Sequence, residues 1–188
     1  MSTYFSHPSF LSHLHSLSTT TSPPPLLRAL ELGSGNGYLG CSLAHSTNSL
    51  FHEIVLSDVG EHLPLMRSTV SLNQDALGPT APAVHVTELL WGAGNGGTQA
   101  RMGGPFSFIF GTDVAYRDYL HKPLLETVEE LLAPEGTCLL GISLCDTTPK
   151  FFDELDKRGF RYEKVNDALV DPKFSGDLFA IIVVERQR

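Results

Sequence analysis

A glycine-rich turn between an apolar run and a helical pattern most restricts the possible folds of this chain. The turn reads ELGSGNGYLG over residues 31–40 and directly follows the apolar run at 26–32. Gly33, Gly35 and Gly37 would let the backbone turn tightly and let a ligand approach it closely. Such a turn is typical of the first strand and helix of a doubly wound α/β sheet, and it predicts a ligand site at this point.

The rest of the sequence alternates predicted strands with predicted helices. Strands are expected at 26–32, 52–59, 83–89, 106–114, 136–144, 160–165 and 177–185, and helices at 37–46, 61–73, 122–134 and 149–159. Alternation indicates a parallel sheet with helices on both faces, whereas the last two strands lack an intervening helix and are expected to be antiparallel. The predicted fold is therefore a Rossmann-like three-layer α/β sandwich. Its seven-stranded sheet is mostly parallel and ends in an antiparallel C-terminal strand pair.

The first 25 residues differ in composition from the rest. They are rich in Ser and Thr and contain no Lys, Arg, Asp or Glu. Phe10, Leu11, Leu14 and Leu17 recur at helical spacing, which favours a short amphipathic helix over an organelle-targeting peptide, since the segment has no arginine. We expect residues 1–25 to form a separate N-terminal segment and residues 26–188 to form the main domain.

Overall charge and composition narrow the class of protein. The chain has 188 residues and a net charge of −8, which argues against a nucleic-acid-binding face. No apolar stretch reaches the ~18 residues of a membrane span. Its three cysteines form no CxxC pair, so reduced thiols are expected. We expect a cytoplasmic monomer, with a nuclear location left open, and no metal site, because the histidines lack ligand spacing (His45, His52, His62, His85 and His121).

Acidic residues near the turn separate two candidate ligands. Asp58 ends the second predicted strand, 21 residues after Gly37, where a carboxylate can accept hydrogen bonds from ribose hydroxyls. The segment 35–40 matches the GxGxxG dinucleotide pattern, so an NAD-dependent oxidoreductase is one alternative. Carboxylates at Glu31, Asp58 and Asp113 would repel a pyrophosphate but attract a cationic amino group. They favour S-adenosylmethionine, which carries such a group, a sulfonium charge and no phosphate.

Five segments carry a resemblance to a known family. In chain order they are ELGSGNGYLG (31–40), IVLSDV (54–59), LPLMRSTVSLN (63–73), LLWG (89–92) and GTDVAYRDYLHKPLLETVEELLAPEGT (111–137). From about Leu26 onward the sequence resembles the seven-β-strand S-adenosylmethionine-dependent methyltransferases. More narrowly it resembles the eukaryotic protein-lysine methyltransferases with an Asp-x-x-Tyr motif, here Asp113 and Tyr116.

The resemblance implies a role for each matching position. The cofactor would be held by Asp58 at the ribose, by Trp91 beside the adenine, by Thr112 and by the loop with its preceding acid (Glu31, Gly33, Ser34, Gly35, Asn36 and Gly37). Asp113 would anchor the incoming ammonium, and Tyr116 would add a hydroxyl and an aromatic wall. The implied substrate, and the implied partner, is a protein that presents a lysine.

One departure from the family leaves a second alternative open. The family normally carries a tryptophan in a helix before the first strand, and no tryptophan precedes Trp91 here. A shortened or divergent member of the same fold could serve as a non-catalytic binding module. Cofactor binding without methylation of any protein would indicate that alternative.

Overall fold

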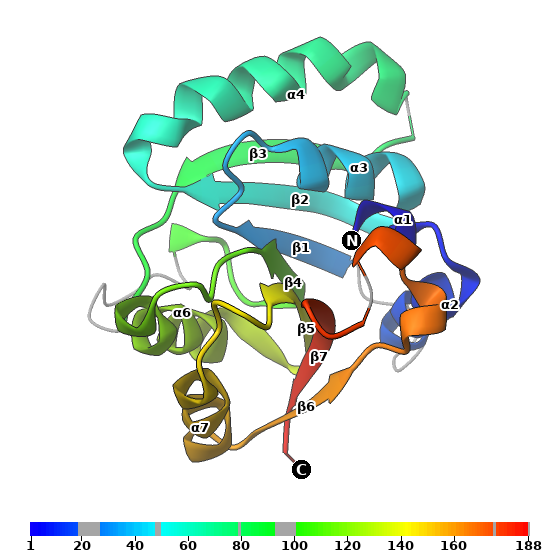
Figure 1. The fold of residues 1–188 in the computed structure, drawn as a ribbon. Coiled ribbons are helices and arrows are strands. Elements are labelled where there is room, and N and C mark those ends of the chain that lie inside the picture. Colours follow the sequence, from blue (N-terminus) through cyan, green and yellow to red (C-terminus); the bar gives the residue numbers. More distant parts are fainter. Residues whose placement is uncertain (19–26, 48–49, 79, 93–100, 175, 188) are drawn as a thin grey trace. The chain divides into compact units, whose positions relative to one another are not determined.

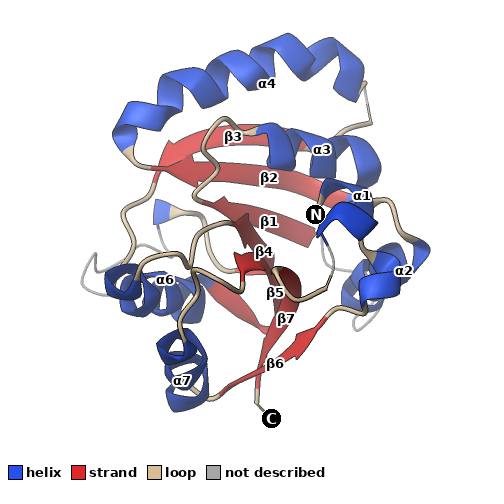
Figure 2. Cartoon of the chain, in the orientation of Figure 1, coloured by secondary structure: helices blue, strands red, loops and turns tan. Residues whose placement is uncertain are grey.

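The computed structural model describes residues 1–18, 27–47, 50–78, 80–92, 101–174 and 176–187 (Figure 1). The chain divides into two compact units, Met1–Leu90 and Trp91–Arg188, and each is described by itself. Both units contain helices and strands among their described residues (Figure 2). Among those residues, no helix combines the length and the apolar character that crossing a bilayer would require.

The first unit is built around a three-stranded parallel sheet in the order β3-β2-β1. Its elements are α1 (Ser2–Phe5), α2 (Pro8–Ser18), β1 (Leu27–Leu32), α3 (Tyr38–Thr47), β2 (Phe51–Asp58), the 3-10 turn η2 (Gly60–His62), α4 (Leu63–Leu77) and β3 (Ala83–Glu88). Helix α3 packs on β2, and α4 packs on β2 and β3. The three strands and both helices were expected, and α4 extends four residues beyond its predicted end.

Register brings the carboxyl ends of β1 and β2 to one edge of this sheet. Leu32 pairs with Ser57, so the turn after β1 begins beside Asp58. Strand β1 is buried except for Arg28, which fits a strand covered on both faces. Strand β3 ends the sheet, and its residues are half-buried or exposed. The glycine turn therefore follows directly after the most buried strand of the unit.

Two short helices precede the sheet. Tyr4 and Phe5 of α1, together with Phe10 and Leu14 of α2, are buried. The ring of Phe10 lies 5.3 Å from that of Tyr4 and 5.2 Å from that of Phe5, and α1 packs against α3. The apolar side chains that recur at helical spacing in the sequence are thus packed in the interior of this unit. The boundary at residues 25 and 26 stays a prediction, because it lies outside the described residues.

The second unit holds the remaining four strands in the order β4-β5-β7-β6. Its elements are β4 (Phe106–Thr112), α6 (Asp118–Leu131), β5 (Leu132–Ser143), α7 (Pro149–Lys157), β6 (Phe160–Lys164), the 3-10 turns η3 (Asp167–Leu169) and η4 (Pro172–Phe174), and β7 (Phe179–Arg186). Strands β4 and β5 are parallel, and β7 is antiparallel to both β5 and β6. The expected antiparallel C-terminal pair is confirmed. Gly159, at φ 68°, follows α7 as predicted.

Helix α6 differs from its predicted bounds. It begins at Asp118, so Pro123 lies inside the helix instead of near its start. The carboxylate of Asp118 lies in the first turn, where its negative charge interacts favourably with the helix dipole. It also accepts hydrogen bonds from Thr148 (2.8 Å) and Lys150 (2.6 Å). Contacts with a distant segment thus support the start of α6 at Asp118, and the predicted start at residue 122 was wrong.

Strands β4 and β5 also differ from their predicted bounds. Strand β4 ends at Thr112, which leaves Asp113 and Val114 in the following turn. Strand β5 begins at Leu132 and includes Pro134, which was expected to close the preceding helix. The expected loop at 91–104 includes residues 93–100, which lie outside the described residues. Cys41 and Cys138 are buried and Cys145 is exposed, and all three are free.

Candidate functional site

The turn after β1 is tied to the end of β2 by two serines. The backbone N–H of Ser34 donates to the carbonyl of Ser57 (3.0 Å), and the N–H of Ser57 donates to the hydroxyl of Ser34 (3.0 Å). The hydroxyl of Ser57 donates to the carbonyl of Glu31 (2.6 Å). The side chain of Asn36 accepts the N–H of Tyr38 (3.0 Å) at the start of α3. Two predicted cofactor residues, Ser34 and Asn36, therefore hold the loop in shape.

Three glycines give this loop its course. Gly33, Gly35 and Gly37 have φ values of 62°, 54° and 77°, which other residues rarely adopt. A Cβ added at Gly35 would meet no atom within 4 Å, so the loop has an open side there. A Cβ added at Gly40 would lie 2.0 Å from Cδ2 of Leu56, so Leu56 would have to shift to admit a side chain at that position. The sequence therefore builds a bare backbone loop over a tight helix–strand contact.

Asp58 lies at the centre of this loop's hydrogen bonds. Its Oδ2 accepts the N–H of Gly35 (2.7 Å), and its Oδ1 accepts the N–H of Val59 (2.7 Å). Nδ1 of His62 lies 3.0 Å from the same Oδ1. A carboxylate offers about four lone-pair directions, so acceptor capacity remains for a ligand hydroxyl. Asp58 thus orients the glycine loop, and its predicted contact with ribose stays a prediction.

Glu31 lies inside the unit rather than on the open side of the loop. Its side chain is only 2% exposed, and its Oε2 accepts the N–H of Gly40 (3.1 Å). Burial raises the pKa of Glu31 to about 8, and the charge of Asp58 adds to this rise. The carboxyl is thus largely protonated at neutral pH, and it helps to fix the start of α3. Direct contact between Glu31 and a cofactor stays a prediction.

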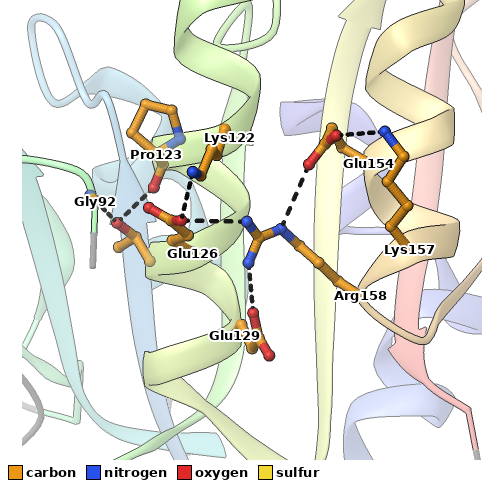
Figure 3. A network of polar contacts seen from close by, with 9 residues as sticks. Gly92, Lys122, Pro123, Glu126, Glu129, Glu154, Lys157 and Arg158 are labelled. Atoms are coloured by element: carbon orange, nitrogen blue, oxygen red, sulfur yellow. Dashed lines mark hydrogen bonds and ion pairs between the residues drawn. The ribbon is translucent and has the colours of Figure 1, made fainter.

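In the second unit, Trp91 is half-buried and is followed by a residue anchored to α6. The N–H of Gly92 donates to Oγ1 of Thr127 (3.0 Å), and that hydroxyl donates to the carbonyl of Pro123 (2.9 Å). Thr127 is 3% exposed, so these bonds are shielded from water. Figure 3 shows Gly92 beside the polar network along α6. The position of Trp91 is therefore fixed through its neighbour.

The same network joins α6 to α7. The guanidinium of Arg158 lies 2.6 Å from a carboxylate oxygen of Glu129, 3.3 Å from Glu126 and 3.9 Å from Glu154 (Figure 3). The side chain of Arg158 is 15% exposed, so its charge is only partly screened. These ion pairs hold α6 against α7 and stabilise the helix that carries Thr127.

The Asp-x-x-Tyr segment forms a sharp turn after β4. Asp113 has a φ of 57° and is the one non-glycine residue with positive φ in the described part of the chain. Its N–H donates to the carbonyl of Gly141 in β5 (2.9 Å). Asp113 and the preceding Thr112 are exposed, whereas Val114 is 3% exposed. This strained conformation aims an acidic side chain outward at the carboxyl edge of the second unit's strands.

Tyr116 presents an aromatic surface close to this turn. Its side chain is 46% exposed, and the guanidinium of Arg117 lies 5.5 Å from its ring centroid. A partly exposed aromatic ring can attract a cation through its π system. The second unit thus exposes the carboxylate of Asp113 and the ring of Tyr116, and their predicted contact with an ammonium group stays a prediction.

His121 was expected only as a surface or packed residue, but it supports this turn. Its side chain is 2% exposed, and its Nε2 lies 2.9 Å from the carbonyl of Ala115. A carbonyl can only accept, so Nε2 carries the proton, while the buried Nδ1 has no hydrogen-bond partner. The ring also packs edge-on against Phe151, with 5.2 Å between centroids. His121 therefore fixes the residue directly before Tyr116.

Each unit thus offers a distinct chemistry. The first has a bare glycine loop with an open side at Gly35 and an oriented carboxylate at Asp58, which fits a ligand with hydroxyl and amino groups. In the second, an exposed carboxylate and an aromatic ring suit a cationic acceptor. Among the described residues, no group of three or more His, Cys, Asp or Glu side chains is arranged to hold a metal ion.

Solved structures define the class of fold. A TehB-like S-adenosylmethionine-dependent methyltransferase from Corynebacterium glutamicum is similar at a TM-score of 0.61 and 14% identity, over 94% of this chain and 87% of that chain. An O-methyltransferase from Bacillus cereus, solved with S-adenosylhomocysteine, is similar at a TM-score of 0.58 and 16% identity, over 96% of this chain and 82% of that chain. The fold is the mostly parallel, seven-stranded fold of the class I S-adenosylmethionine-dependent methyltransferases, as predicted.

A family assignment follows from the sequence. A sequence model of the family described as lysine methyltransferase matches residues 2–158, and the chain belongs to that family. It is an S-adenosylmethionine-dependent methyltransferase, and S-adenosylmethionine is its cofactor. The NAD-dependent alternative raised by the GxGxxG pattern was therefore wrong. That pattern identified a ligand loop but could not identify the ligand.

Proposed function

We propose that this methyltransferase acts on a lysine side chain of a protein. The single observation that carries the proposal is the exposed carboxylate of Asp113, held at positive φ beside Tyr116, in a chain of the lysine methyltransferase family. A carboxylate that faces solvent attracts an ammonium group, and an aromatic ring suits the aliphatic stem of lysine. A neutral carbon or oxygen acceptor would lack this charge attraction.

Residues of the chain have separate roles in this proposal. In the first unit, the loop from Gly33 to Gly37 and Asp58 bind the cofactor, which supplies an activated methyl group on a sulfonium sulfur. Asp113 in the second unit orients the acceptor nitrogen. The lysine ammonium loses a proton to water before it attacks the methyl group, because only the neutral amine is a nucleophile. The bound cofactor would supply its methyl group to this nitrogen, and its sulfur would keep the electron pair of the carbon–sulfur bond.

Labelling of a cell lysate tests the proposal. The protein is incubated with lysate proteins and tritiated S-adenosylmethionine, and labelled proteins are hydrolysed to amino acids. We expect the label in methylated lysine, and labelling about tenfold slower with the Asp113→Asn variant. Label in another amino acid would contradict lysine specificity. Binding of S-adenosylhomocysteine without any labelling would support the non-catalytic alternative. The cytoplasmic location and the monomeric state also stay predictions, which imaging of a fluorescent fusion and light scattering would test.

A further inference from the structure

Two exposed leucines lie side by side at the carboxyl edge of the second unit's sheet. Leu144 and Leu178 are 36% and 58% exposed. The N–H of Leu144 donates to the carbonyl of Leu178 (2.8 Å), so the two residues are paired across adjacent chain segments. We call Leu144 and Leu178 the apolar rim. Exposed apolar side chains that gather in one place often mark a binding surface.

Strand register places the apolar rim at a defined distance from Asp113. Thr112 at the end of β4 pairs with Gly141 of β5, and Ser143 of β5 pairs with Phe179 of β7. The apolar rim therefore lies one to two strands away from Asp113 and at the same edge. Neighbouring strands are ~4.8 Å apart, and Leu144 lies two residues (~7 Å) beyond the level of Asp113, so the separation is up to ~12 Å. An extended peptide advances ~3.3 Å per residue, so about three to four residues would bridge it.

Acidic residues border the apolar rim. Asp146 and Asp177 are exposed, and Asp177 directly precedes Leu178. Oδ2 of Asp146 accepts a hydrogen bond from the hydroxyl of Ser143 (2.7 Å), which keeps its charge beside the end of β5. Lys164 donates to the carbonyl of Gly176 (3.0 Å), but its ammonium also lies 3.0 Å from the carboxylate of Asp167. Together with Asp113, this border favours a partner that carries positive charge.

We propose that the apolar rim binds the substrate chain beside the target lysine, and that the substrate carries an apolar side chain about three to four residues from that lysine with basic residues nearby. The occupant is thus an extended basic–apolar segment of the protein substrate. This inference rests on the proposed function, because the distance is measured from Asp113, the residue proposed to orient the acceptor lysine.

The test compares variants that remove apolar surface at two places. Leu178→Ser removes it from the apolar rim, and Leu72→Ser removes an 82% exposed leucine of α4 in the first unit as a matched control. A third variant, Asp177→Lys, reverses one charge at the border. Each protein is incubated with tritiated S-adenosylmethionine and lysate proteins, and mass spectrometry maps the methylated lysines. Calorimetry with S-adenosylhomocysteine and thermal unfolding show that each variant is folded.

We expect Leu178→Ser to label lysates about fivefold more slowly, because half of a leucine side chain no longer gains burial against the substrate. Asp177→Lys should also be slower, and Leu72→Ser should match wild type. Mapped lysines should have an apolar residue two to four positions away. Wild-type labelling by folded Leu178→Ser, or mapped sites without such a residue, would overturn the inference alone. A wild-type protein that binds S-adenosylhomocysteine but labels no lysine would overturn the proposed function, and the inference with it.

Discussion

Replacement of Asp113 separates the chemistry of its carboxylate from the conformation of its backbone. Its φ of 57° suits glycine and asparagine, whereas alanine in this region is disfavoured by roughly 1–2 kcal/mol. Asp113→Ala would therefore destabilise the turn even if the carboxylate had no role in methyl transfer. Asp113→Asn and Asp113→Gly are the informative changes, since both tolerate the turn and both keep the N–H that donates to Gly141.

The size of the expected effect follows from the bond that is lost. A hydrogen bond to a charged group contributes about 1.5–3 kcal/mol. At ~1.4 kcal/mol for each factor of ten, its loss slows methyl transfer roughly 10- to 150-fold. We expect Asp113→Asn at the mild end and Asp113→Gly at the severe end, because the amide still orients the amine. Thermal midpoints should stay at the wild-type value for Asp113→Asn and stay equal or rise for Asp113→Gly.

Single-turnover labelling with tritiated S-adenosylmethionine, calorimetry with S-adenosylhomocysteine and thermal unfolding should be measured on the same preparations. Loss of turnover with retained folding and cofactor affinity is the expected pattern. Undiminished turnover in a stable Asp113→Gly protein would refute the role of the carboxylate. Parallel losses of stability and cofactor binding would show that the residue is structural.

Three further changes test individual parts of the account. His121→Phe keeps a ring against Phe151 but loses the hydrogen bond to Ala115, so turnover should fall severalfold without loss of thermal stability. His121→Gln can donate a hydrogen bond again and should recover part of the turnover. Wild-type turnover in His121→Phe would contradict this role. Gly40→Ala should lower the free energy of unfolding by about 1–3 kcal/mol in urea titrations, because its Cβ would lie 2.0 Å from a side-chain carbon of Leu56. The pKa of Glu31 is raised from 4.5 to about 8 by folding, so the folded state binds more protons in that range and stability should fall as pH rises through it. Glu31→Gln should flatten this fall in thermal midpoints, and an unchanged slope would show that another group titrates.

Most of the fold could be predicted because its signals are local. The sequence shows the alternation of strands and helices and the glycine turn after β1 within a few residues. It also predicts no α-helix between β6 and β7, and the described residues there form only the 3-10 turns η3 and η4. Helix α6 was predicted less well, because the bonds from Thr148 and Lys150 to Asp118 come from a segment 30 residues away. Pro123 was a local signal that these distant contacts overrode.

The candidate site was only partly predictable for the same reason. The position of Asp58 at the end of the second predicted strand placed it near the glycine loop. Its hydrogen bond from the N–H of Gly35 could not be predicted, because it depends on the register of β1 and β2. The role of His121 was missed, although the sequence held a signal. His121 shares helical spacing with Leu124, Leu125 and Val128, which are all buried. A histidine on the apolar face of a helix needs a polar partner, and here that partner is Ala115.

Calorimetric binding of S-adenosylhomocysteine to wild type, Asp58→Ala and Asp113→Asn tests most directly whether cofactor and acceptor depend on different residues. The account predicts clear binding to wild type, unchanged affinity in Asp113→Asn, and affinity lowered about tenfold or more in Asp58→Ala, which loses both the acceptor for ribose and the bond that orients Gly35. Affinity undiminished by Asp58→Ala, or abolished by Asp113→Asn, would contradict it.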